Sequence, residues 1–183
     1  MRVTTTTVNL RDPQGKRTKP LDGLHDLGEW QFLQLGHYTE ASPWSVTQGT
    51  TEKLTFQESD ISYIEGNGLA VSYDYTDQLF KPQQLRDIFL SEIRFKCKCT
   101  NQNGYADVRV DVPNFVYSPV QGETFGIPKG AGVEQFVSLD GAIFIGQDLI
   151  DNGFEINFTA GDGNFQIYDI SILSCRIGSG KSL

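Results

Sequence analysis

The sequence predicts an all-β protein, an antiparallel jelly-roll β-sandwich preceded by an extended N-terminal arm. Residues 105–112 alternate without a break and place four apolar side chains on one face: Ala106, Val108, Val110 and Val112. A period of two is typical of a half-buried antiparallel strand. The alternation returns in residues 154–159, and the 19 glycines of the 183-residue chain supply the turns that such strands need.

Eight or nine strands at this spacing indicate a sandwich or barrel, of which the jelly roll is the favoured form. We expect strands at residues 53–57, 61–64, 69–75, 89–99, 106–112, 134–139, 142–145, 155–159 and 165–177. Turn sequences rich in Gly, Asn and Asp separate them, at residues 65–68, 101–104, 140–141, 151–153 and 161–164. A short helical turn is expected only at residues 82–87. The last strand loses its alternation at residues 169–171, which predicts a bulge or burial on both faces.

The chain is expected to divide into an arm, residues 1–45, and a jelly-roll body, residues 46–183. The first 20 residues carry five basic side chains and one acidic side chain, a net charge of +4. The other 163 residues carry ten basic and 22 acidic side chains, a net charge of −12. This asymmetry predicts an arm that reaches a negatively charged partner surface. The expected partner-binding residues are Arg2, Arg11, Lys16, Arg17 and Lys19, with Trp30, Phe32 and Trp44 as apolar anchors.

Composition argues against three classes of partner or location. A membrane span is not expected, because the sequence lacks a run of about 18 apolar residues. The Thr-rich start lacks the apolar stretch of a secretory signal, so export is not expected either. The acidic body would be repelled by phosphates, so nucleic-acid binding is not expected.

The sequence predicts no catalytic residue, no metal site and no cofactor. Cys97 and Cys99 share a strand face with apolar residues, and all three cysteines, Cys175 included, are interpreted as small buried hydrophobes. Only Cys175, His25 and His37 could complete a metal site with them, and none has the usual ligand spacing. No nucleophile motif accompanies either histidine. The protein is therefore not expected to be an enzyme.

Two further groups of residues are candidates for binding sites. The acidic pairs Asp74/Asp77 and Asp148/Asp151 lack the oxygen-rich repeat of a calcium loop, so we interpret them as solvated turn residues. Among the aromatic residues, Tyr105 shares its strand face with charged side chains. It is the best candidate for an exposed ring on which a sugar could stack.

A resemblance to a known group is carried by residues 129–135 (Lys-Gly-Ala-Gly-Val-Glu-Gln), the strands of residues 136–145, and the closing stretch of residues 162–177 with its Ile-Tyr-Asp-Ile run. Over residues 46–178 the chain resembles jelly-roll virion proteins of tailed bacteriophages. The resemblance implies a capsid decoration or cement protein that binds the major capsid protein or another virion protein. It also implies a homo-oligomer, a trimer ahead of a dimer, made in the bacterial host cytoplasm and located on the capsid surface. It assigns no role to any single residue.

Two other function classes remain open. One is a receptor- or glycan-binding jelly-roll module of a phage tail or head fibre, which would use exposed aromatic side chains. The other is a cupin-like enzyme, which would need histidine and carboxylate ligands on its barrel strands. Both histidines lie outside the predicted body, which argues against the enzyme.

Overall fold

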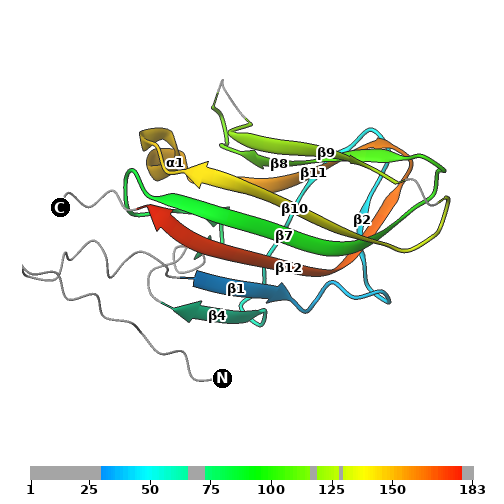
Figure 1. The fold of residues 1–183 in the computed structure, drawn as a ribbon, viewed down its shortest axis with the longest axis horizontal. Helices are drawn as coiled ribbons and strands as arrows, with labels where there is room; N and C mark the ends of the chain where they lie inside the picture. Colours follow the sequence, from blue (N-terminus) through cyan, green and yellow to red (C-terminus); the bar gives the residue numbers. More distant parts are fainter. Residues whose placement is uncertain (1–29, 66–72, 116–118, 128–129, 179–183) are drawn as a thin grey trace, which may run out of the picture.

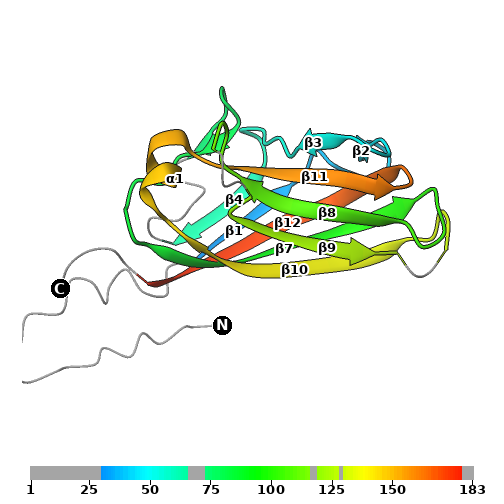
Figure 2. The ribbon, with the colours of Figure 1, turned by 90° about the horizontal axis from the view of Figure 1, so that it is seen from above.

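The computed structural model describes residues 30–65, 73–115, 119–127 and 130–178. In these residues two antiparallel β-sheets pack face to face, with their long strands running along the same axis (Figures 1 and 2). The predicted fold class, an all-β antiparallel jelly-roll sandwich, is confirmed. Within the described part of the chain, no helix is long and apolar enough to cross a membrane.

The larger sheet has the strand order β10-β7-β12-β1-β4, and a short strand, β2, also pairs with β12. Its strands are β1 (Trp30–Leu35), β2 (Trp44–Val46), β4 (Ile61–Glu65), β7 (Ile88–Cys99), β10 (Gln135–Phe144) and β12 (Phe165–Gly178). The longest two, β7 and β12, lie side by side at the centre of this sheet.

The smaller sheet has the order β3-β11-β8-β9. Its strands are β3 (Thr51–Lys53), β8 (Tyr105–Asp111), β9 (Gln121–Gly126) and β11 (Glu155–Asp162). A separate two-stranded ribbon joins β5 (Tyr73–Asp74) and β6 (Leu79–Phe80). The alternation that predicted β8 is observed directly, because its apolar side chains are buried and the side chains between them are not.

Aromatic rings fill the space between the sheets. Phe158 of β11 makes edge-to-face contacts with four other rings, at centroid distances of 5.3 to 6.3 Å: Trp44, Phe95, Phe125 and Phe165. Such edge-to-face pairs are favourable beyond the apolar area that they bury. The core therefore connects both sheets and includes Trp44, a residue that the sequence placed in the arm.

The irregularity predicted in the last strand is a β-bulge. The pairing of β12 with β7 shifts register between Tyr168 and Ser171, and Asp169 adopts a positive φ of 52°. The bulge leaves both Tyr168 and Ile170 buried. Tyr168 is covered on the outer face by Lys98, 5.7 Å from its ring centroid, and its hydroxyl donates a hydrogen bond of 2.6 Å to Glu134.

The structure corrects three sequence predictions. Residues 30–45 contribute β1 and β2 to the larger sheet, so the boundary predicted at residue 45 falls inside the sandwich. The turn predicted at residues 140–141 is absent, because β10 runs through both residues while paired with β7. The helix of the described residues is α1 (Gln147–Asn152), whereas residues 82–87 form a non-helical turn.

Candidate functional site

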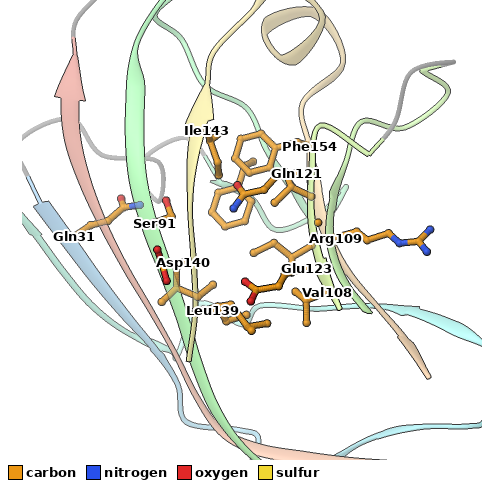
Figure 3. A pocket seen from close by; sticks show the side chains of 16 residues that line it. Gln31, Ser91, Val108, Arg109, Gln121, Glu123, Leu139, Asp140, Ile143 and Phe154 are labelled. Carbon is orange, nitrogen blue, oxygen red and sulfur yellow. The ribbon is translucent and has the colours of Figure 1, made fainter. Parts of the chain in front are cut away.

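A cavity of about 60 Å³ lies between the two sheets, next to their edge strands β9 and β10 (Figure 3). Its walls are mainly apolar and include Val110, Ile143, Phe154 and Ile156. We call the boundary between β9 and β10 the seam, because each is the last strand of its own sheet and they are not paired with each other. Glu123 and Asp140, which line the cavity at the seam, are exposed, so the cavity meets solvent there.

A buried polar row forms one wall of the cavity. Gln31, Ser174, Ser91 and Gly141 occupy adjacent positions on β1, β12, β7 and β10. The hydroxyls of Ser91 and Ser174 are hydrogen-bonded at 2.8 Å, and Gln31 is 1% exposed. Polar groups at this depth require partners, so the three polar side chains favour this register of β1, β12 and β7, and Gly141 continues the row on β10.

Gln121 of β9 bridges the seam from the opposite sheet. Its amide lies over Gly141 so closely that a Cβ at that glycine would be 1.5 Å from Nε2. This contact explains why a glycine stands inside β10, where the sequence predicts a turn. The Oε1 atom of Gln121 is buried and has no hydrogen-bond partner in the described residues. The seam therefore contains an acceptor that is removed from water.

Two carboxylates flank the seam. Glu123 lies two residues after Gln121 on the same face of β9 and reaches toward β10 (Figure 3). Asp140 lies on the exposed side of β10. Neither carboxylate makes a hydrogen bond or ion pair with a described residue. Arg109 also borders the cavity, but its guanidinium points away and pairs with Asp107 at 3.0 Å. The seam is thus an acidic site without a cation among the described residues.

The outer face of the larger sheet carries an apolar patch at the end where β1 begins. Trp30, Cys175, Leu90 and Ala142 are adjacent on β1, β12, β7 and β10. Phe144 and Ile177 extend the patch along two of these strands. We call these six residues the outer patch. Exposed fractions are 41% for Trp30, 47% for Leu90, 59% for Phe144 and 53% for Ile177. The patch ends at β10, the strand that borders the seam.

The predicted partner-binding residues lie in different parts of the structure. Arg2, Arg11, Lys16, Arg17 and Lys19 lie outside the described residues. Trp30 and Phe32 lie on the outer face of β1, and Trp30 belongs to the outer patch. Trp44 instead packs against Phe158 and Tyr38, at 5.7 and 5.9 Å between ring centroids. Its ring is a core contact, so the prediction that Trp44 is a docking anchor finds no support in its surroundings.

The prediction that the cysteines are buried is confirmed for Cys97 and Cys99 but not for Cys175. Cys97 and Cys99 are fully buried, and burial raises the pKa of the Cys97 thiol to about 12. Cys175 is half-buried in the outer patch. No group of three or more potential metal ligands occurs among the described residues. His37 contacts Asp60, with 2.8 Å between Nδ1 and Oδ1, and His25 lies outside the described part.

The remaining candidates have local partners. Asp74 and Asp77 both pair with Lys81, at 2.6 and 2.7 Å, and this ammonium lowers the pKa of Asp74. Asp148 and Asp151 belong to α1, where Gln147 donates a hydrogen bond to Asp151. Tyr105 is 48% exposed, and its ring lies against Gly161.

Sequence reasoning missed Gln121, Glu123 and Gly141. The sequence signal for the strand that contains Gln121 and Glu123 is weak. Gln121, Glu123 and Phe125 take the inward positions, alternating with glycine and threonine, and two of these three inward side chains are polar instead of apolar. A polar side chain on the interior side of an edge strand departs from the pattern that identifies a strand, although natural sheets use this device to protect edges.

The comparisons with known proteins show the fold and no family. No family model matches the sequence, and no curated protein matches it. Among solved structures, Eiger TNF from S. frugiperda has a TM-score of 0.51 at 6% identity, over 85% of this chain and 96% of that one. PRD1 vertex protein P5 has a TM-score of 0.47 at 12% identity, over 82% and 74% of the two chains. A chain of the T13 IBDV viral particle has a TM-score of 0.34 at 6% identity, over 85% and 31%. The likeness to Eiger TNF is a shared fold, and the two viral likenesses are weaker.

Proposed function

We propose that this chain is a non-enzymatic virion structural protein, a capsid decoration or cement protein that binds the major capsid protein and stabilises the shell. The observation that carries the proposal is the outer patch, an exposed apolar surface that begins at the first described residue, Trp30. The basic residues predicted to reach a partner precede Trp30 in the chain. The sequence resemblance to jelly-roll virion proteins supplies the class of partner.

The outer patch is large enough to mark an interaction surface. Its four most exposed side chains together expose the equivalent of two whole side chains, roughly 400 Å². Contiguous apolar patches of about 300–600 Å² on a single chain are often functional. A stable interface needs about 800 Å² from each partner, so the patch would supply about half. We propose that residues 1–29 supply the rest.

The charges near the patch fit the same division of roles. Glu92, next to the patch on β7, is held by Arg94 and Ser138, and these contacts lower its pKa. Its charge is therefore satisfied within the protein. The basic side chains of residues 1–20 are then the part of the chain best suited to an acidic shell, while the patch provides apolar contact area.

The test is association with particles. Particles are purified by density gradient from a culture that carries the gene, and an antibody against the chain is used for detection. We expect the chain to band with the particles and to be accessible to the antibody on their surface. We also expect it to remain bound at 1 M salt, because salt weakens ionic contacts but not apolar ones. The chain found only in the soluble fraction would overturn the proposal.

The second candidate function is a receptor- or glycan-binding module, and the exposed ring of Tyr105 favours it. Asp107 and Arg109 share a strand face with Tyr105, and Asp107 accepts hydrogen bonds from Arg109 and Thr124. A glycan array on the purified chain tests this function. Binding that is lost in Tyr105→Ala but kept in Tyr75→Ala, a ring with 41% exposure elsewhere, would support it.

A further inference from the structure

The seam contains acceptors that lack donors. The buried Oε1 of Gln121 has no hydrogen-bond partner among the described residues, and the carboxylate of Glu123 has neither a hydrogen bond nor an ion pair there. Asp140 adds a second uncompensated carboxylate on the neighbouring strand. The Gln121 acceptor is buried, and a buried acceptor without a donor costs free energy, whereas Glu123 and Asp140 are exposed to water. Together these groups favour a ligand that brings a donor to Gln121 and positive charge to the two carboxylates.

The cavity behind these acceptors suits the stem of a basic side chain. Its walls are mainly apolar, and its volume of about 60 Å³ exceeds what a single water needs. Lysine and arginine bury their aliphatic stems along apolar surface while the charged head stays near acceptors or water. A lysine or arginine that enters at the seam would meet both requirements at once.

The cations of the described residues are already engaged. Among the eight lysines and arginines there, only Arg86 forms no ion pair with a described residue. The other seven form ion pairs: Lys53, Lys81, Arg94, Lys96, Lys98, Arg109 and Arg176. The largest remaining supply is the five basic side chains within residues 1–20. Charge complementarity therefore points from the seam to the N-terminal segment of the same chain.

The outer patch provides a path between that segment and the seam. Trp30 lies three strands from β10, a distance of about 14 Å at the usual strand spacing. The ten residues 20–29 could span up to about 33 Å when extended, so Lys16, Arg17 and Lys19 can reach the seam. Residues 21–29 also contain Leu21, Leu24 and Leu27, which match an apolar surface. The segment thus has apolar residues for the patch and basic residues beyond them for the seam.

We infer that the N-terminal segment docks on its own chain: its leucines cover the outer patch, and a basic side chain among Lys16, Arg17 and Lys19 enters the seam at Glu123 and Gln121. This docking describes the free protein and does not depend on the proposed function. On a particle the same segment would exchange this internal site for the coat protein. Binding to a partner would then compete with docking on the seam.

Cys175 is the reporter for the test, because it lies in the outer patch and the other two cysteines are buried. The rate of its reaction with a thiol reagent is measured on four full-length chains. These are the native sequence, the seam variant Glu123→Lys with Asp140→Lys, the segment variant Lys16→Glu with Arg17→Glu and Lys19→Glu, and the combination of both. Asp148→Lys, on α1 and not among the residues that line the cavity, is the matched control.

We expect each charge-reversed variant to react about tenfold faster than the native chain. The combination, in which opposite charges face each other again, should return toward the native rate, and the control should not differ from native. Cys97 and Cys99 must stay unreactive in every variant, which shows that the core is intact.

Equal rates in all five chains would overturn the inference. A native rate that depends on protein concentration would also overturn it, since the segment would then dock on a neighbouring copy. Particle association is a separate measurement, so failure of one does not imply failure of the other.

Discussion

Arg176 of β12 and Asp87, the residue before β7, form an ion pair inside the sandwich. The Nε and Oδ2 atoms are 3.2 Å apart, and the two side chains are 4% and 2% exposed. The guanidinium also lies over the ring of Phe89, 5.5 Å from its centroid. Removing two charges from water is expensive, so a pair at this depth is stable only while both members are present.

We therefore expect Arg176→Met to lower the free energy of unfolding by about 3 kcal/mol or more, because it leaves the Asp87 carboxylate buried without its cation. The double variant Arg176→Met with Asp87→Leu should recover most of that loss, since it removes both charges. Urea denaturation measures both values. A single variant that loses less than about 1 kcal/mol would contradict this account of the pair.

Two glycines should respond differently to alanine. At Gly104 a Cβ would lie 2.7 Å from the backbone oxygen of Asp162, which cannot move alone, and 2.4 Å from the Cys99 sulfur. At Gly141 the conflict is with the amide of Gln121, the mobile end of a side chain. We expect Gly104→Ala to cost about 2 kcal/mol and Gly141→Ala less than about 1 kcal/mol in thermal or urea unfolding. Equal costs would mean that Gln121 is fixed in place.

Stability should fall at alkaline pH. Burial raises the pKa of Cys97 from its ordinary value of 9.0 to about 12, and it raises the pKa values of Tyr73 and Tyr168 as well. Between pH 9 and pH 12 the unfolded chain releases the Cys97 proton while the folded chain keeps it. The folded state then binds more protons, so the free energy of unfolding decreases as pH rises, by up to about 1.4 kcal/mol per pH unit for each such group.

The check is urea denaturation at a series of pH values above 8, with Cys97→Ala beside the native chain. Over the pH range between 9 and 12, we expect the free energy of unfolding of the variant to fall less steeply than that of the native chain. The difference in slope should correspond to one proton, up to about 1.4 kcal/mol per pH unit. An identical slope in both chains would exclude Cys97 as a contributor and leave the two tyrosines as the cause.

The sequence was most informative where one face of a strand is buried and the other is exposed. Residues 105–112 have this pattern, and β8 (Tyr105–Asp111) matches the prediction closely. The bulge in β12 was also visible, because Tyr168 and Ile170 must both be buried around Asp169. In these strands the apolar period and the burial agree.

The sequence was least informative at the seam. Gly141 follows an aspartate, a combination typical of turns, but it lies inside β10 because Gln121 from the other sheet occupies the space of a side chain. A contact between residues twenty positions apart, on different sheets, leaves no local signal. The same reason explains Trp44, whose core role depends on pairing with β12 and on a ring more than a hundred residues later, Phe158.

The next prediction concerns the oligomeric state of the protein. We expect a homo-oligomer, a trimer ahead of a dimer, because the outermost strands of both sheets have only one paired neighbour among the described residues and virion proteins act through symmetric contacts. Light scattering coupled to size exclusion at micromolar concentration measures the mass. A mass of 20.4 kDa, that of one chain, would count against an oligomer that forms without the particle.

The last prediction separates the two tryptophans that the sequence assigned to the arm. Trp30→Ala removes an exposed ring and should change stability by less than about 1 kcal/mol, while it weakens particle binding by about 2 kcal/mol. Trp44→Ala removes a ring that packs on Phe158 and should cost about 3 kcal/mol of stability, with binding changed only through partial unfolding.

Deletion of residues 1–29 belongs to the same experiment. We expect the remaining chain to fold and to lose particle binding, whereas Arg11→Ala or Lys16→Ala alone should weaken binding only slightly, because an exposed ionic contact contributes less than about 1 kcal/mol. Co-sedimentation with particles measures binding, and circular dichroism checks the fold. If the shortened chain and Trp30→Ala both bind as tightly as the full chain, neither the segment nor the outer patch is the tether. The contact would then be sought within residues 119–132, a range that includes β9 on the other side of the seam.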